Sequence, residues 1–199
     1  MSKEPPRLVV GISGASGVAY GVRVLDACRE MGVETHLVVS RAALLTLAQE
    51  TRLSLADLSA KAHVAHKVGD LGATIASGSV RTIGMIIAPC SVKTMSEIAT
   101  GVTSSLLTRA ADVTLKERRP LVLMVRETPL HLGHLRTMVQ LAEMGAILAP
   151  PLPAFYARPR DIAEMVDQSV GRCLDLFGLS WGAVRRWDGE IAPPDVEAD

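Results

Sequence analysis

An apolar run, a loop of small residues and a helical pattern follow one another between residues 8 and 23. Leu8 to Ile12 is apolar, largely β-branched and of strand length, and residues 18–31 place apolar side chains at helical spacing. Ser13-Gly14-Ala15-Ser16-Gly17 separates them. This order favours a phosphate-binding loop, because glycines allow close backbone approach and a helix N-terminus offers free N–H groups. A tight strand-to-helix turn needs the same small residues, so the loop alone leaves both interpretations open.

A second strand is predicted over residues 33–40, which completes a βαβ unit. A dinucleotide-binding unit would carry G-x-G-x-x-G and an acidic residue near the end of this strand to hold a ribose. Here the glycines are Gly11, Gly14 and Gly17, and the strand ends in Ser40-Arg41. The missing carboxylate disfavours NAD and leaves a mononucleotide or a simple phosphate.

The rest of the chain alternates between strand and helix patterns. Continuous apolar runs over 83–90 and 121–125 are typical of buried parallel strands, and a last strand is predicted over 146–149. A further short strand is expected near Val64. Helices are predicted over 41–50, from Ser54, from Ser91, and over 104–119, 130–144 and 162–177. We therefore expect one α/β domain over 1–199, with a core of about 8–178 and a polar tail over 179–199. Its mostly parallel, doubly wound sheet, Rossmann-like or flavodoxin-like, would carry helices on both faces and bind ligands beyond the carboxyl ends of its strands.

Charge and cysteine content narrow the class of protein further. Lys plus Arg and Asp plus Glu both number 21, so no global field attracts nucleic acid or an anionic membrane. Three widely spaced cysteines suit a reducing cytoplasm, and we expect each to be a buried small hydrophobe. Without an apolar signal region or an 18-residue apolar run, the chain is expected to be soluble and cytoplasmic.

Polar candidates gather where the predicted strands end. The hydroxyls there suit phosphate contacts, although the same residues would cap helices: Ser13, Ser16, Ser40, Ser91 and Thr94. Arg109 and Lys116 lie seven residues apart on one helical face and could converge on an anion, whereas a solvated face would explain about half of the basic residues nearby. Arg126 and Glu127 follow a buried strand and are less easily explained as surface decoration.

Two further candidates come from helix ends. Glu50 ends a predicted helix, where a carboxylate interacts unfavourably with the helix dipole, so a functional role is open. His131 and His134 are spaced like a metal pair, but no HExxH pattern or third ligand accompanies them. We therefore predict helix capping or a surface position for these histidines, and no metal site. The absence of G-x-S-x-G also argues against a serine hydrolase.

Several longer stretches are similar to the UbiX family of flavin prenyltransferases, within the homo-oligomeric flavin-containing decarboxylase-like superfamily. The similarity runs from about Leu8 to Trp187. It is carried by GISGASGVAYGVR over 11–23, QET over 49–51, PCSVKT over 89–94, LTRAADVTLKERRPLVL over 107–123, VRETPLHLGHL over 125–135 and PLPAFY over 151–156.

The resemblance implies an activity. Family members join a dimethylallyl group from dimethylallyl phosphate to N5 and C6 of reduced FMN without a metal. The prenylated FMN then serves UbiD-type decarboxylases that act on aromatic or α,β-unsaturated acids. The resemblance further implies a homo-oligomer, a dodecamer with sites at subunit interfaces. The balanced charge predicts no nucleic-acid or membrane partner.

It also implies site residues. FMN would be bound by Gly14, Ala15, Ser16, Ser40, Ser91, Val92, Lys93, Thr94 and Arg126. Dimethylallyl phosphate would be bound by Arg109, Lys116, Arg126, Glu127, Tyr156 and Arg172. The catalytic set would be Ser16, Glu50, Lys116, Glu127 and Trp187. Within it, Ser16 and Glu50 would handle protons near N5, and the Trp187 indole would face an allylic cation. A core or interface anchor is the alternative for Trp187.

Three other functions would each require a sequence feature of their own. A flavin-dependent cysteine decarboxylase would carry an asparagine in a P-A-x-x-N-T segment, where this chain has Pro89-Cys-Ser-Val-Lys-Thr94. Direct decarboxylation of an aromatic acid would need a carboxylate pocket separate from the phosphate site. A non-catalytic flavin carrier would not need Glu50, Lys116 and Glu127 together.

Overall fold

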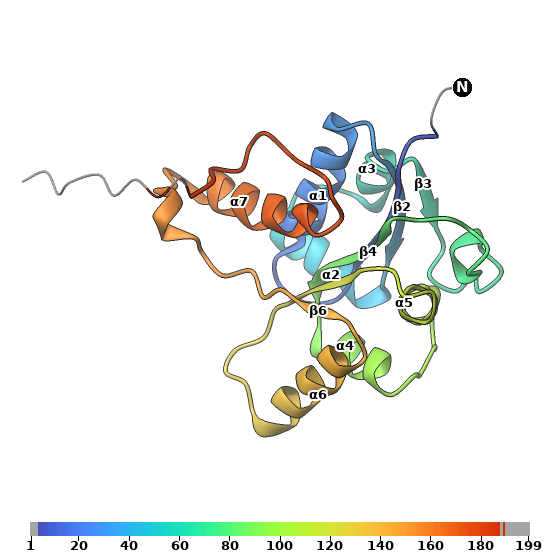
Figure 1. The fold of residues 1–199 in the computed structure, drawn as a ribbon. Helices are drawn as coiled ribbons and strands as arrows, with labels where there is room; N and C mark the ends of the chain where they lie inside the picture. Colours follow the sequence, from blue (N-terminus) through green and yellow to red (C-terminus); the bar gives the residue numbers. More distant parts are fainter. Residues whose placement is uncertain (1–3, 188, 190–199) are drawn as a thin grey trace, which may run out of the picture.

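The computed structural model describes residues 4–187 and 189, and six strands in these residues form one all-parallel sheet (Figure 1). The strand order is β3-β2-β1-β4-β5-β6. The strands are β1 (Arg7–Ile12), β2 (Glu34–Val39), β3 (Val64–His66), β4 (Gly84–Cys90), β5 (Leu121–Val125) and β6 (Ile147–Leu148). The predicted doubly wound α/β fold is confirmed, and the short strand expected near Val64 forms one outer edge of the sheet. Strand order reverses between β1 and β4, which is where such sheets place their ligand crevice.

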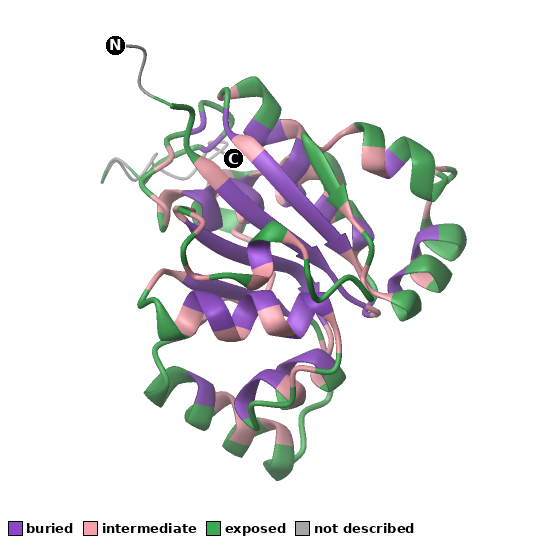
Figure 2. Ribbon diagram, turned by 90° about the vertical axis from the view of Figure 1, so that its right-hand side faces the viewer, coloured by how far each residue is buried: buried purple, intermediate pink, exposed green. Residues whose placement is uncertain are grey.

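Helices cover both faces of this sheet, as predicted (Figures 1 and 2). One face carries α1 (Val18–Glu30), α2 (Arg41–Glu50), α3 (Leu55–Ala60) and α7 (Ile162–Asp175), whose apolar residues share one core. The other face carries α4 (Val92–Ala99), α5 (Leu106–Lys116) and α6 (Leu132–Glu143), which share a second core. Two short 3₁₀ turns, η1 (Thr74–Ala76) and η2 (Phe155–Ala157), lie in the connections.

Alternation along the strands supplies both cores. In β1, Leu8, Val10 and Ile12 belong to the core under α1 and α7, whereas Val9 belongs to the core under α4 and α5. Every residue of β4 and β5 is buried, because these strands are covered on both faces. This explains why they read as continuous apolar runs rather than as alternating patterns.

The C-terminal segment differs from the polar tail expected from the sequence. Trp181 is only 5% exposed and belongs to the core shared with α1 and α7. Its indole Nε1 donates to a Glu30 carboxylate oxygen at 2.7 Å, and the Arg23 guanidinium lies over its ring. The predicted polar tail thus contributes Trp181 to the core, because an aromatic ring with a satisfied N–H can extend a core.

Two expectations about composition can be compared with the structure. All three cysteines are buried and free, which confirms their predicted role as small hydrophobes. None of the helices in the described residues combines the length and the apolar character that a membrane-spanning helix requires.

Gly21 lets α1 lie directly against the end of β4. A Cβ atom at this position would be 2.4 Å from the carbonyl oxygen of Ala88 and 2.7 Å from the side chain of Ile12. Because the first of these neighbours is backbone, it cannot move aside without displacing the strand. The glycine thus brings the loop before α1 and the loop after β4 together, and these two loops carry many of the candidate residues.

We predict that Gly21→Ala destabilises the protein by about 1–3 kcal/mol, since the steric overlap outweighs the better helix propensity of alanine. The measurement is the free energy of unfolding from denaturant titration. Gly182→Ala is the matched control, because a Cβ there meets no atom within 4 Å. Equal stability of Gly21→Ala and Gly182→Ala would contradict the assigned role of Gly21.

Candidate functional site

A cavity of about 410 Å³ opens at the carboxyl edge of the sheet. Five of the residues predicted to bind a cofactor line it together: Gly14, Ser40, Ser91, Lys93 and Thr94. They come from the ends of three different strands, β1, β2 and β4, so only the parallel pairing brings them to one place. Ser104 and Ser105, which precede α5, complete the polar wall.

Three helices begin at this cavity, and each is capped by a serine that lines it. Ser40 accepts from the Ala43 N–H of α2 at 3.1 Å. Ser91 and Ser105 do the same for α4 and α5, at 3.3 and 3.4 Å. Helix N-termini carry partial positive charge, so their convergence favours an anion. Sequence reasoning missed Ser105, although a serine before an apolar helical run is a recognisable capping signal.

Most of the formal charge at the cavity is internally paired. The Lys93 ammonium lies 2.9 Å from a Glu97 carboxylate oxygen, and the Ser104 hydroxyl donates to the same oxygen at 3.1 Å. Lys93 is largely exposed, whereas Glu97 is largely covered. The cavity therefore presents hydroxyls, helix ends and the Arg41 guanidinium, a donor set that fits a phosphate ester or the polar edge of a ring.

Ser13 connects the loop after β1 to the loop after β4 through hydrogen bonds. Its hydroxyl donates to the Pro89 carbonyl at 3.0 Å and accepts from the Ser91 N–H at 2.7 Å. The side chain is fully buried. Its role is thus to hold the loop after β1 against the loop after β4, and it has no free donor left for a ligand.

The N-terminus of α1 is closed by a side chain of the protein itself. Glu50, at the end of α2, accepts from the Gly17 N–H at 2.9 Å and from the Val18 N–H at 2.9 Å. The N–H groups of Gly17 and Val18 are therefore not free to face an anion, in contrast to the expectation for the start of this helix. A carboxylate at the negative end of one helix is stabilised here because it lies at the positive end of another.

Several groups act on the Glu50 carboxyl. Burial raises its pKa, but hydrogen bonds from the Ser16 hydroxyl and the Gly17 and Val18 amides, with the Arg126 charge, outweigh burial, so the pKa is lowered. Arg126 also opposes the rise in pKa that burial imposes on Tyr20, in the first turn of α1. Ser16, Glu50 and Arg126 thus form one electrostatic group at the start of α1, beside the predicted cofactor loops.

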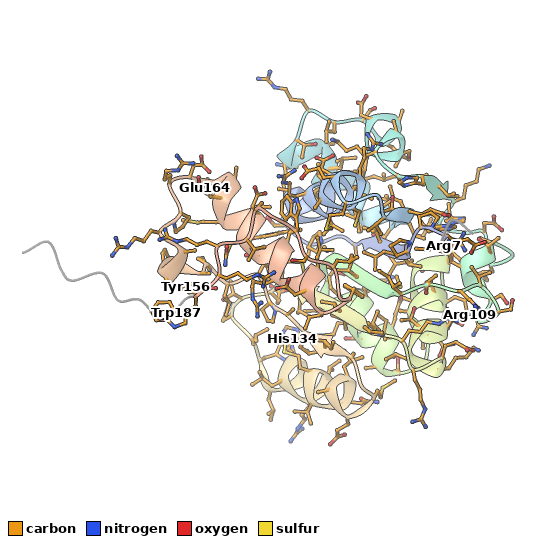
Figure 3. The ribbon with its side chains drawn as sticks, turned by 45° about the horizontal axis from the view of Figure 1, so that its top comes forward. Arg7, Arg109, His134, Tyr156, Glu164 and Trp187 are labelled. Carbon is orange, nitrogen blue, oxygen red and sulfur yellow. The ribbon has the colours of Figure 1, made fainter. Side chains whose placement is uncertain are left out.

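A second group of predicted residues lies on η2, on α7 and on the chain that follows α7. The Tyr156 ring meets the Trp187 ring edge-on, with centroids 6.1 Å apart (Figure 3). The buried side chain of Gln168 donates to the Tyr156 hydroxyl at 3.1 Å. Arg172 pairs with Asp175 at 2.6 Å. Sequence reasoning missed Gln168, since a lone glutamine in an amphipathic helix gives no signal.

Arg109 and Lys116 form a third group on α5. Arg109 pairs with Asp112 at 2.7 Å, and Lys116 pairs with its neighbour Glu117. Because α5 and α7 cover opposite faces of the sheet, these cations cannot reach Tyr156 or Arg172 within one chain. Figure 3 shows Arg109 on the opposite side of the molecule from Tyr156 and Trp187. The predicted substrate-binding residues are therefore not brought together by a single copy.

The histidine pair behaves as predicted. His131 caps α6, with its Nδ1 accepting from the Gly133 N–H at 3.0 Å, and its ring stacks on that of His134. Within residues 4–187 and 189, no group of three His, Cys, Asp or Glu side chains is arranged to hold a metal ion.

Comparison with known proteins defines the class to which this fold and site belong. A family model described as Flavoprotein matches residues 1–173. The flavin prenyltransferase UbiX of Thauera aromatica is 57% identical over 92% of this chain and 94% of its own length. That of Escherichia coli K12 is 56% identical over 92% and 98%. The chain is a flavoprotein.

Solved structures of related proteins support the same family assignment. The crystal structure of AnUbiX (PadA1) in complex with FMN and dimethylallyl pyrophosphate matches with a TM-score of 0.93 and 46% identity, over 94% of this chain and all of that one. A dodecameric FMN-dependent UbiX-like decarboxylase from Escherichia coli O157:H7 matches with a TM-score of 0.89 and 49% identity, over 92% and 100%. Within the flavoproteins, the chain belongs to the UbiX flavin prenyltransferases.

We predict that Glu50→Ala lowers stability by about 1 kcal/mol at neutral pH, because two helix N–H groups lose their acceptor. The lowered pKa means that the ionised carboxylate is favoured in the folded state. Its contribution is therefore present above the unfolded-state pKa of about 4.3 and is lost as pH falls through the lower folded value. Urea midpoints measured from pH 7 down to pH 3 should converge for the wild type and Glu50→Ala.

Glu50→Gln is the matched variant. It keeps one acceptor oxygen and loses the charge, so its stability should lie between the other two at neutral pH. A constant gap between wild type and Glu50→Ala at every pH would contradict the capping role of the ionised carboxylate.

Proposed function

We propose that this protein transfers a dimethylallyl group from dimethylallyl phosphate to N5 and C6 of reduced FMN. The observation that carries the proposal is the cavity of about 410 Å³ where three capped helices begin at one sheet edge. Its hydroxyl donors suit the phosphate and ring edge of a flavin mononucleotide. When bound and reduced, FMN supplies the nucleophilic nitrogen and carbon of the reaction.

The residues proposed to hold FMN surround this cavity or adjoin it. They are Gly14, Ala15, Ser16, Ser40, Ser91, Val92, Lys93, Thr94 and Arg126. Gly14 approaches α2 so closely that a Cβ there would lie 2.4 Å from that of Ala42. Ser16 and Glu50 lie next to this loop, and Ser16 helps to lower the pKa of the Glu50 carboxyl, which supports a proposed role in holding or moving a proton near N5.

The residues proposed to act on dimethylallyl phosphate are cations, a phenol and a carboxyl group: Arg109, Lys116, Arg126, Glu127, Tyr156 and Arg172. Breaking an allylic carbon–oxygen bond leaves negative charge on the phosphate, which positioned cations and hydroxyl donors stabilise. Trp187 offers an exposed indole ring beside Tyr156, suited to facing the positive allyl group. Positioning both substrates and excluding water would supply much of the remaining rate enhancement.

The separation of these residues supports a site shared between copies of the chain. Arg109 and Lys116 lie under one face of the sheet, and Tyr156 and Arg172 lie over the other. An anion contacted by both groups must therefore lie between subunits. We propose a homo-oligomer, a dodecamer as in the E. coli O157:H7 structure, in which a neighbouring copy supplies the α5 cations.

The product of the proposed reaction indicates the kind of partner that would receive it. Prenylated FMN is a cofactor, so it would pass to a UbiD-type decarboxylase. Three buried free thiols support a reducing, cytoplasmic environment. The cysteine-decarboxylase alternative gains little from structural likeness, because TvaF, for example, is only 17% identical and shares the fold alone.

Anaerobic incubation of the protein with reduced FMN and dimethylallyl phosphate should yield a flavin heavier by one prenyl unit, measured by mass spectrometry of the released flavin. Oxidised FMN is the control and should be returned unchanged. Bound FMN of unaltered mass after incubation with the reduced flavin would favour a carrier over an enzyme.

Subunit sharing predicts complementation. Lys116→Ala and Tyr156→Phe should each lose activity, and oligomers reassembled from a mixture of the two should regain part of it, because some interfaces then combine an intact Lys116 with an intact Tyr156. Activity of the mixture equal to the average of the two variants would place both residues in sites within one chain.

A further inference from the structure

We propose that Gln168 is a positioning residue that turns the Tyr156 hydroxyl toward the substrate phosphate and fastens the C-terminal strap, residues 179–187. The inference rests on the proposed contact between Tyr156 and dimethylallyl phosphate. Gln168 lies in α7, is 4% exposed and makes three hydrogen bonds with its one amide group.

The backbone of Arg185 fixes the orientation of this amide. The Arg185 N–H donates to Gln168 Oε1 at 3.0 Å, and Gln168 Nε2 donates to the Arg185 carbonyl at 2.9 Å. A backbone N–H can only donate and a carbonyl can only accept, so the reverse orientation would oppose two donors and two acceptors. The –NH₂ group therefore has to be on the side that faces Tyr156.

This orientation determines the direction of the hydrogen bond to tyrosine. Gln168 Nε2 donates to Tyr156 Oη at 3.1 Å, so the phenol oxygen acts as the acceptor. The phenol proton is then free to point away from Gln168. A phenol that already accepts from the protein is prepared to donate to an anion, which is what a leaving phosphate requires.

The same amide holds the strap that carries Trp187. Val184 packs so closely on α7 that a Cβ at Gly171 would be 1.9 Å from its side chain. Arg186 forms two hydrogen bonds with Asp175, at 2.7 and 2.9 Å. Gln168 is the residue that contacts both the strap backbone and Tyr156, on which Trp187 rests edge-on (Figure 3). One side chain thus links the two substrate-facing aromatic residues.

Two variants separate these functions. Gln168→Glu keeps an oxygen for the Arg185 N–H but replaces the shared donor to Tyr156 and to the Arg185 carbonyl with an acceptor, so the phenol proton turns inward. Gln168→Leu removes all three hydrogen bonds at similar volume. Gln140→Leu is the matched control, because Gln140 in α6 donates only to the Ala99 carbonyl.

Burial raises the pKa of an introduced carboxyl to as much as about 9, so assays at about pH 9.5 keep it mostly ionised. Gln168→Glu and Gln168→Leu should each raise the KM for dimethylallyl phosphate about tenfold, the effect of losing one hydrogen bond to a charged group, with FMN binding unchanged. In a Tyr156→Phe background Gln168→Glu should not raise the KM further, whereas Gln168→Leu also releases the strap that carries Trp187. Hydrogen exchange followed by mass spectrometry should be at least tenfold faster at the Arg185 amide in Gln168→Leu, and near wild type in Gln168→Glu.

The outcomes distinguish the two proposals. A wild-type KM in the Gln168 variants, with a raised KM in Tyr156→Phe, overturns the orienting role alone. Additive effects of Gln168→Glu and Tyr156→Phe in the double variant also overturn it, because Gln168 would then act other than through the hydroxyl. A wild-type KM in Tyr156→Phe overturns the proposed substrate contact of Tyr156, and the orienting role with it. Unchanged exchange at Arg185 in Gln168→Leu overturns the fastening role.

Discussion

Parallel pairing of the strands decides where the polar groups of this protein can lie. Because the strands of the described sheet run in one direction, the helices that follow β1, β2 and β4 begin at the same edge. Each helix start leaves N–H groups that need an acceptor. The protein satisfies α1 with its own carboxylate, Glu50, and satisfies α2 and α4 with serines that also face a cavity.

These two kinds of helix cap create two chemical environments at the carboxyl edge of the sheet. At α1, Glu50 is held ionised by Ser16, two amides and the charge of Arg126, which produces a fixed negative group beside the central loops. At α2, α4 and α5, short hydroxyl side chains leave room and donors for an external anion. Gly21 and the buried hydroxyl of Ser13 keep these environments adjacent, since they hold the loops after β1 and β4 together.

The sheet also separates two groups of candidate residues. Residues on α5 and residues on α7 lie over opposite faces, so Lys116 and Tyr156 can serve one substrate only if copies of the chain assemble. The strap after α7 has a comparable dependence on tertiary contacts. Trp181 fills the core beneath it and Gln168 holds its backbone, and these contacts place Trp187 against Tyr156.

Much of the fold followed from local patterns. Apolar runs at 83–90 and 121–125 predicted buried strands, and serines before helical runs predicted caps. Both predictions succeed because burial on two faces and helix capping each depend on residues that are close together in the sequence. Family similarity added residues such as Tyr156 and Arg172, which no local pattern distinguishes. Gln168 stayed unrecognised, since a single polar residue in a helix has many explanations until its partners are known. Ser105 was missed although a serine before an apolar helical run is a recognisable capping signal.

The sequence by itself determined the alternation of strands and helices, the small-residue loop after the first strand and the absence of a ribose carboxylate after the second. Tertiary structure decided which helix N-termini remain available for an anion. The Glu50 carboxylate interacts unfavourably with the dipole of its own helix, α2. Only the packing of α2 beside the start of α1 shows that this carboxylate caps another helix. The physical reason is that a helix dipole extends beyond its own segment, so its partner can come from 32 residues away in the chain.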